Sequence, residues 1–101
     1  MSNEGKVCVV SGASGGVGTA VVKKFYDNGY KVIMLDINEE GMKKSIQDEK
    51  YEAGRIDYIA LDISSEEQVK AAAAKIKEKH GRVDALVNTA AIVGKYNKTI
   101  E

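Results

Sequence analysis

A glycine-rich stretch constrains the fold of this chain more than any other feature of its sequence. Residues 11–18 read Ser-Gly-Ala-Ser-Gly-Gly-Val-Gly and follow a β-branched apolar run at residues 6–11. A strand, a glycine turn and a helix, in that order, form the context that a phosphate-binding loop requires. In such a loop Gly12 permits the tight turn, Gly16 lets a pyrophosphate approach the backbone, and Gly18 lets the helix pack against the sheet. A glycine-rich turn without a ligand is the alternative.

The rest of the chain alternates strands with helices. We expect strands at residues 6–11, 31–36, 56–63 and 83–89, because these are short apolar runs rich in β-branched residues. In the first two, the apolar residues are continuous rather than alternating, which favours strands buried on both faces. The order β-α-β-α-β-α-β implies parallel pairing, since each crossover returns the chain to the same end of the sheet. The sequence therefore predicts one α/β domain over residues 1–101.

Helical spacing predicts the three helices. The first is expected to end before Gly29 and to bury a stripe made of Val17, Ala20, Val21 and Phe25. The second covers about residues 39–51, and its many charged residues are expected to form a solvated face. The third is expected to begin with a capping box made by Ser64 and Glu67. It is expected to bury a stripe made of Val69, Ala72, Ala73, Ile76 and His80, with His80 in a capping or surface role.

Charge and composition exclude several functions. Lys+Arg and Asp+Glu are both 15, so the formal net charge is zero, and the basic excess of a nucleic-acid binder is missing. The sequence has one His and one Cys, with no cluster of Cys, His and Asp at ligand spacing, so it predicts no metal site. No apolar run approaches the length of a membrane span, and no secretory signal is visible at the start. The lone Cys8, expected to be buried in a strand, fits a reducing cytoplasm.

Asp36 ends the second expected strand, 18 residues after Gly18. An acid at this position can accept hydrogen bonds from the hydroxyls of an adenine ribose. Its charge would repel a 2′-phosphate, which favours NAD over NADP. A solvated or helix-capping aspartate at a strand end is the alternative interpretation.

Three motifs together resemble the short-chain dehydrogenase/reductase family. The first is the spacing of the three loop glycines, which differs from the tighter G-x-G-x-x-G. The second is Leu61-Asp-Ile-Ser64 after the third expected strand. The third is Asn88-Thr-Ala-Ala91, which is similar to the family's Asn-Asn-Ala-Gly, with Thr89 and Ala91 as departures. Ala91 adds a Cβ where the family usually has none.

The resemblance implies a half Rossmann-type open sheet with strand order 3-2-1-4 and a bound dinucleotide. It places Asp62 and the backbone that follows it against the adenine, and Asn88 near the ribose. A basic residue before Gly16 or after Asp36 often marks NADP use in the family, and this chain has Gly15 and Ile37 there. The implied cofactor-binding residues are Gly12, Ser14, Gly16, Val17, Gly18, Asp36, Ile37, Asp62, Ile63, Asn88 and Ala90.

The family's catalytic pair, Tyr-x-x-x-Lys on a later helix, has no counterpart in this sequence. The lysine of such a pair lowers the pKa of the tyrosine, so that the phenol can exchange a proton with the substrate. None of the five tyrosines has a lysine four residues later. Tyr51 with Arg55 is the nearest imitation, and arginine does not deprotonate in that role. No catalytic residue is therefore assigned, and the chain corresponds to the first half of the family's domain.

Two classes of function remain open. The chain is either the NAD-binding part of an oxidoreductase, or a non-catalytic dinucleotide-binding or self-assembling module with a vestigial site. A phosphorelay receiver is excluded, because the acidic pair expected after the first strand is Gly-Ala-Ser-Gly here. The fourth strand would be an unprotected sheet edge beside an uncovered sheet face. We therefore expect a homo-oligomer, or a second chain that supplies the missing half.

Overall fold

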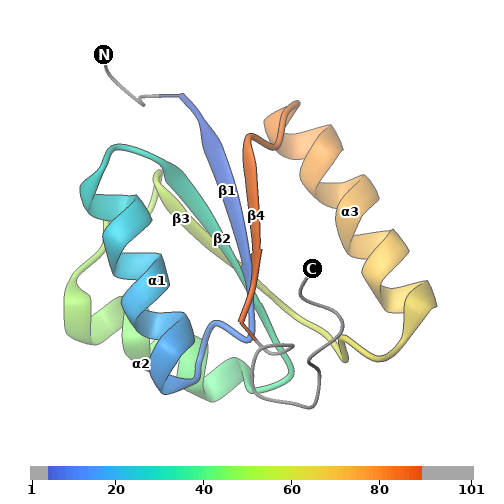
Figure 1. Cartoon of the computed structure of the whole chain (residues 1–101), viewed down its shortest axis with the longest axis horizontal. Coiled ribbons are helices and arrows are strands. Elements are labelled where there is room, and N and C mark those ends of the chain that lie inside the picture. The colour runs from blue at the N-terminus through green and yellow to red at the C-terminus, as the bar shows by residue number, and fades with distance from the viewer. Residues whose placement is uncertain (1–4, 90–101) are drawn as a thin grey trace.

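Four parallel strands and three helices make up the chain (Figure 1). The structure is a computed structural model, and it describes residues 5–89. The strands are β1 (Val7–Ser11), β2 (Lys31–Asp36), β3 (Ile56–Ala60) and β4 (Ala85–Asn88), and the helices are α1 (Gly16–Asp27), α2 (Glu39–Glu49) and α3 (Glu66–His80). The sheet order is β3-β2-β1-β4 with every pairing parallel, which confirms the predicted half Rossmann sheet of order 3-2-1-4.

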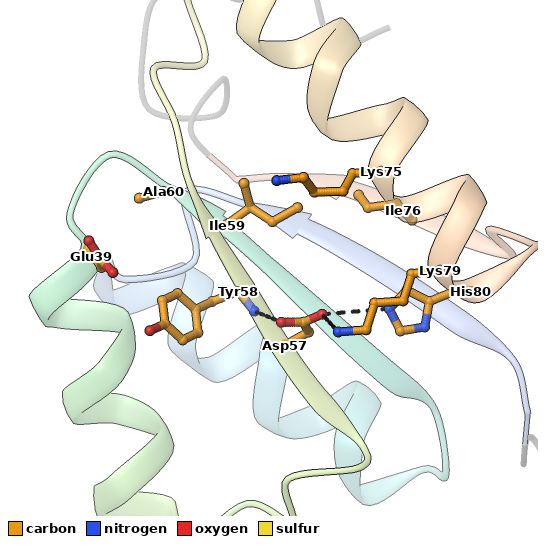
Figure 2. Close-up of a pocket in the computed structure, with 9 residues that line it drawn as sticks. All are labelled: Glu39, Asp57, Tyr58, Ile59, Ala60, Lys75, Ile76, Lys79 and His80. Carbon is orange, nitrogen blue, oxygen red and sulfur yellow. Dashed lines mark hydrogen bonds and ion pairs between the residues drawn. The ribbon is translucent and has the colours of Figure 1, made fainter.

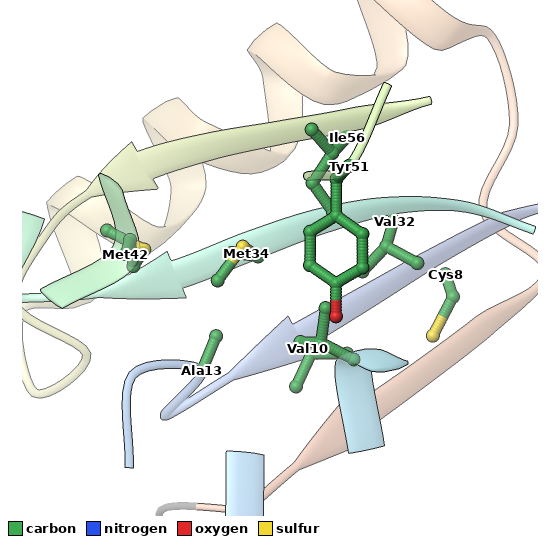
Figure 3. Packing of buried hydrophobic residues seen from close by; sticks show 9 residues of the cluster. Cys8, Val10, Ala13, Val32, Met34, Met42, Tyr51 and Ile56 are labelled. Carbon is green, nitrogen blue, oxygen red and sulfur yellow. The ribbon is translucent and has the colours of Figure 1, made fainter. Parts of the chain in front are cut away.

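The helices cover the two faces of the sheet unequally. Helices α1 and α2 lie on one face and α3 lies alone on the other (Figure 1). Alternate residues of β1 enter two separate apolar clusters: Cys8 and Val10 face α1 and α2, while Val7 and Val9 face α3. Figure 3 shows part of the larger cluster. Strands β1 and β2 are thus buried on both faces, as their continuous apolar runs predict, whereas β3 and β4 are only partly buried.

Helix α1 buries a different face from the one expected. Gly18 and Val22 are its buried residues, whereas Val17 is 56% exposed and Ala20 is also exposed. The predicted stripe was therefore wrong at Val17 and Ala20, although Val21 and Phe25 do pack against the core. The cause is Gly18: the helix packs closely against the backbone of Gly12 and Ala13 through a residue without a side chain, and a pattern of apolar residues cannot show this.

Strands β3 and β4 are shorter than predicted, because an aspartate side chain near one end of each binds backbone N–H groups. Strand β3 ends at Ala60 rather than at residue 63, because the chain turns at Asp62, whose Oδ1 accepts from the N–H and the hydroxyl of Ser64. Strand β4 begins at Ala85 rather than at residue 83. Just before it, the Asp84 carboxylate accepts the N–H of Val7 at 2.8 Å, a contact that replaces one step of the ladder.

Helix α3 begins one residue later than the sequence pattern indicates. Its N-cap is Ser65, whose hydroxyl accepts from the N–H of Gln68, so Ser64 and Glu67 do not form the expected capping box. The Gln68 side chain instead accepts the N–H of Asp62 at 2.8 Å. The buried stripe holds at Ala72 and Ile76, but Ala73 is exposed.

Candidate functional site

The residues predicted to bind a ligand gather at the carboxyl ends of the strands. The chain runs from β1 outward to β2 and β3, and then crosses back to β4 on the other side of β1. Open parallel sheets bind ligands at such a switch point, in the crevice beyond the strand ends. Ser11 and Asn88 stand on the two sides of this point, and the Ser11 hydroxyl donates to Asn88 Oδ1 at 2.8 Å.

The glycine loop connects β1 to α1, and its three glycines meet three different constraints. Gly12 has φ +72°, a conformation that side chains disfavour, and its N–H donates to the carbonyl of Leu35 at 2.9 Å. A Cβ on Gly18 would lie 2.0 Å from the Gly12 carbonyl oxygen, so only glycine fits there without a backbone shift. A Cβ on Gly16 would meet nothing within 4 Å, so the space beside Gly16 is open.

The first turn of α1 is arranged to receive an anion. Its N-cap is Gly15, which has no side chain to bond the first helical N–H groups, and no acidic residue lies in the first turn. These N–H groups and the helix dipole favour negative charge at this end. The donor set therefore fits a phosphate or pyrophosphate group beside Gly16.

Asp36 ends β2 beside this loop, and its carboxylate is held in place from both sides. Its Oδ2 accepts the N–H of Ser14 at 3.0 Å and its Oδ1 accepts the N–H of Asn38 at 3.0 Å. Partial burial alone would raise the pKa of Asp36, but these hydrogen bonds outweigh it and hold the pKa below its ordinary value. The carboxylate is therefore ionised at neutral pH and remains an acceptor for ligand hydroxyls.

The other predicted residues lie around this centre. Ile37 is 70% exposed beside Asp36. The carboxylate of Asp62 bonds Ser64, which holds its pKa below the ordinary value, while Ile63 packs its side chain against the cluster under α3. The N–H of Leu61 donates to the carbonyl of Asp36 at 3.0 Å, which brings the Asp62 turn close to the end of β2. Ala90 lies outside residues 5–89.

Thr89 is a residue of the site that sequence reasoning missed. It is 4% exposed, and its hydroxyl donates to the carbonyl oxygens of Ser11 at 2.7 Å and Gly12 at 3.1 Å. In the sequence Thr89 stands out only as a departure from a motif, and nothing local relates it to a loop 77 residues away.

Tyr51 and Arg55 do not form a proton-relay pair. The Arg55 guanidinium lies over the Tyr26 ring, 3.9 Å from its centroid, and donates to the carbonyls of Tyr26 near the end of α1 and of Tyr30 just before β2. Burial, followed by the charges of Glu49 and Asp27, raises the pKa of Tyr51 to about 12. A relay needs the opposite shift.

A well-defined groove among the described residues lies away from the glycine loop. It has a volume of about 530 Å³ and lies along the free edge of β3, between that strand and the helices α2 and α3 (Figure 2). Inside it, Asp57 Oδ2 accepts from Lys79 Nζ at 2.9 Å and lies 3.7 Å from His80 Nε2. The His80 side chain lies in the last turn of α3, as predicted, but it is only 11% exposed, so a surface role was wrong: the ring packs inward against β3.

Cys8 and the acidic and metal-ligating side chains lie in environments that limit their chemistry. Cys8 is fully buried, and burial raises the pKa of its thiol to about 11, so it stays a protonated apolar residue at neutral pH. Among residues 5–89 no cluster of three or more His, Cys, Asp or Glu side chains could hold a metal ion. No helix in the same range is long and apolar enough to cross a membrane.

Comparisons with known proteins place these observations in context. The sequence profile of the family described as short chain dehydrogenase matches residues 6–101. A 3-oxoacyl-(acyl-carrier-protein) reductase from Thermotoga maritima is 36% identical over 92 residues, which cover 91% of this chain and 37% of that protein. The chain thus spans little more than a third of this curated relative.

Solved structures agree with the sequence comparison. A 3-ketoacyl-(acyl-carrier-protein) reductase from Brucella melitensis, complexed with NADH, matches with a TM-score of 0.74 and 34% identity, over 84% of this chain and 34% of that one. A metagenomic short-chain oxidoreductase in complex with NADP matches with a TM-score of 0.76 and 30% identity, over 82% of this chain and 38% of that one. The two matched structures hold different dinucleotides.

Proposed function

This chain belongs to the short-chain dehydrogenase/reductase family, and from that premise we propose that it is the NAD(H)-binding part of an oxidoreductase. The observation that carries the proposal is the connection between the glycine loop and Asp36. The Ser14 N–H bonds Asp36 Oδ2, so the open space beside Gly16 and an ionised carboxylate stand in one fixed arrangement. A dinucleotide presents a pyrophosphate and ribose hydroxyls, which match these two groups.

Each part of the ligand is assigned to residues of this site. The first turn of α1, with Gly16, Val17 and Gly18, would hold the pyrophosphate. Asp36 would accept from the adenine-ribose hydroxyls, and Ile37 offers an exposed apolar surface to the adenine. When bound, the nicotinamide supplies the hydride chemistry. The contribution of this chain is to bind and orient the dinucleotide.

We further propose that the site prefers NAD(H) to NADP(H). The support is the charge of Asp36, which would face a 2′-phosphate at close range. Gly15 and Ile37 add no basic side chain that could neutralise such a phosphate. The matched structures hold NADH or NADP, so family membership alone leaves the choice open.

The experiment is a calorimetric titration of the purified chain with NADH and with NADPH. We expect saturable NADH binding and at least tenfold weaker NADPH binding. Asp36→Asn keeps an acceptor for Ser14 but removes the charge, so it should weaken NADH binding about tenfold and narrow the difference between the two ligands. Asp48→Asn, which removes an exposed charge on α2, is the matched control. No binding by the folded chain contradicts the proposal, and equal binding of the two dinucleotides contradicts the preference.

We assign proton transfer to the substrate to residues outside this sequence. The support is that none of the 101 residues forms a Tyr-x-x-x-Lys pair. Alcohol or ketone turnover by the purified chain alone would contradict this assignment. We propose a cytoplasmic setting, in keeping with Cys8 as a buried free thiol.

We also propose that the chain assembles through β4. Leu86 on this strand is 70% exposed, and Val83 just before it is 50% exposed. In the described part of the chain, β4 pairs only with β1, so its other edge carries no strand. A second copy of the chain is the proposed occupant; a different polypeptide carrying the remainder of a family domain is the alternative. A self-assembling module with a vestigial nucleotide site would use the same edge.

A further inference from the structure

Thr89 lies directly after β4, and its side chain reaches across to the start of the glycine loop. The hydroxyl donates to the carbonyl oxygen of Ser11 at 2.7 Å and approaches that of Gly12 at 3.1 Å, while the Thr89 N–H also donates to Ser11 at 3.1 Å. The residue is 4% exposed, so water does not compete effectively for these carbonyls. Both carbonyls also accept a backbone N–H, so the hydroxyl adds a second hydrogen bond to each of them and constrains the direction in which it points.

The Gly12 carbonyl is the point at which several constraints on the loop meet. It accepts the N–H of Gly15 at 3.3 Å, which closes the turn before α1. The same oxygen lies where Gly18 packs, since a Cβ on Gly18 would come within 2.0 Å of it. A rotation of the Gly12 peptide would therefore displace Gly15 and the first turn of α1 together.

The loop is tied to β2 independently of Thr89. The N–H groups of Gly12 and Ala13 both donate to the Leu35 carbonyl, at 2.9 and 3.2 Å, and Ser14 donates to Asp36. These bonds hold the N–H side of the turn. Thr89 is the side chain that holds its carbonyl side, and it does so from the strand on the opposite side of β1.

We propose that Thr89 is the positioning residue of the phosphate loop: its hydroxyl orients the Ser11 and Gly12 carbonyls, and thereby aims the first N–H groups of α1 at the pyrophosphate. The identity of the ligand in this inference rests on the proposed dinucleotide binding. The orienting of the two carbonyls by the Thr89 hydroxyl does not rest on it. Thr89 touches no ligand group in this scheme and acts only through the backbone of the loop.

The test compares Thr89→Val, which has nearly the same shape without the hydroxyl, with Thr89→Ser, which retains it. In the ligand-free protein, NMR hydrogen exchange of the Gly15 amide, which donates to the Gly12 carbonyl, should accelerate at least fivefold in Thr89→Val. Amides in the interiors of α2 and α3 should stay within twofold of wild type. Thr89→Ser should resemble wild type throughout. Exchange that is unchanged, or accelerated equally in loop and helices, overturns the proposal.

Ligand titrations separate this proposal from the proposed function. Thr89→Val should weaken ADP-ribose binding five- to tenfold and leave adenosine, which lacks phosphates, within twofold. If wild type fails to bind ADP-ribose, the proposed function fails, while the exchange experiment still decides the role of Thr89. Equal losses for ADP-ribose and adenosine contradict a role confined to the phosphate loop.

A measurement on the unmodified protein covers the case in which Thr89→Val does not fold. The Thr89 hydroxyl proton should give a slowly exchanging NMR resonance with cross-relaxation to the α-protons of Gly12. Rapid exchange of this proton with water would contradict a buried, bonded hydroxyl.

Discussion

Gly16 and Gly18 are two residues apart, yet they are glycines for different physical reasons. At Gly18 the backbone of the preceding turn fills the space that a side chain would need, with the Gly12 oxygen 2.0 Å from the Cβ position. At Gly16 no atom lies within 4 Å of the position that a Cβ would take. Gly18 therefore serves the fold whether or not a ligand binds, whereas at Gly16 the fold would accept a side chain, and under the proposed function the open space receives the ligand.

Alanine substitutions should separate these two reasons. Gly18→Ala forces the loop away from α1, and overpacking of this kind costs about 1–3 kcal/mol, measured as the free energy of unfolding in urea. Gly16→Ala should leave that free energy unchanged or raise it by up to about 1 kcal/mol, since alanine favours the helix. It should nevertheless weaken NADH binding. If Gly16→Ala lowered the free energy of unfolding while Gly18→Ala left it unchanged, the two assigned reasons would be wrong.

Asp57 should make stability depend on pH. Partial burial raises its pKa, but hydrogen bonds from Lys79 and the Tyr58 N–H, with the charges of Lys79 and His80, outweigh it and hold the pKa below the ordinary value. A lowered pKa in the folded state means that ionised Asp57 stabilises the fold above the unfolded pKa of about 3.9, and that this contribution is lost as pH falls through the lower folded value.

Asp57→Asn should therefore reduce the free energy of unfolding by about 1–3 kcal/mol at pH 7, and the difference from wild type should shrink as the pH falls below the unfolded pKa of about 3.9. Urea titrations at several pH values measure it. The control is Asp48→Asn, whose carboxylate makes a surface pair with Lys44 and should change stability by less than about 1 kcal/mol. A difference that grows as pH falls would contradict the assigned direction.

At the scale of single residues, the sequence predicted some positions and missed others. The tight turn at Gly12, the close packing of Gly18 and the position of Asp36 at a strand end could be predicted, because each depends on residues close by in the chain. Val17 was assigned to the wrong helix face because apolar character alone cannot show that Gly18 makes the close approach. Thr89 was missed because its partners are 77 and 78 residues away.

Among the elements, α3 shows how a local pattern can be displaced by one residue. Ser64 and Glu67 have the spacing of a capping box, but Ser64 is drawn into the Asp62 turn, where its hydroxyl donates to the carboxylate at 2.7 Å. Ser65 then takes the N-cap position. The type and approximate ends of the seven elements could be read from periodicity, whereas this competition between neighbouring hydroxyls could not.

Substitutions of the two serines test the reassignment of the cap. Ser65→Ala removes the side chain that accepts from Gln68, so it should lower the free energy of unfolding by about 1 kcal/mol. Ser64→Ala leaves the Ser64 N–H bond to Asp62 intact and should have a smaller effect. Thermal and urea unfolding of both variants measure this, and a larger loss in Ser64→Ala would restore the original capping box.

The whole molecule has two sheet edges of different character. Within residues 5–89, β3 and β4 are the outer strands. On β3, the Tyr58 N–H donates to the Asp57 carboxylate at 2.8 Å, and Lys79 binds the same carboxylate from α3. On β4, Leu86 is in register with Val9, which packs under α3, but Leu86 itself is 70% exposed. A charged carboxylate thus protects one edge, while an apolar side chain marks the other.

This asymmetry predicts the route of self-association. The chain should sediment as a dimer or larger species at high micromolar concentration, and Leu86→Lys should shift it toward the monomer. Ile37→Lys is the matched control, because Ile37 is equally exposed but lies at the end of β2. A monomeric wild type at this concentration contradicts the proposed assembly, and equal effects of the two substitutions contradict the role of β4.

The crowding at Gly18 also has a consequence for how such a chain can change over generations. Any single-base change in a glycine codon that alters the residue introduces Ala, Val, Ser, Cys, Arg, Trp, Asp or Glu, or a stop. Each of these residues carries a Cβ, so every one-step neighbour at Gly18 meets the Gly12 oxygen. In a lineage that had ceased to use the dinucleotide, Gly18 would persist for packing, while Gly16 would drift freely to other residues. Variation at Gly16, rather than persistence of Gly18, is therefore the genetic signature of a lost ligand.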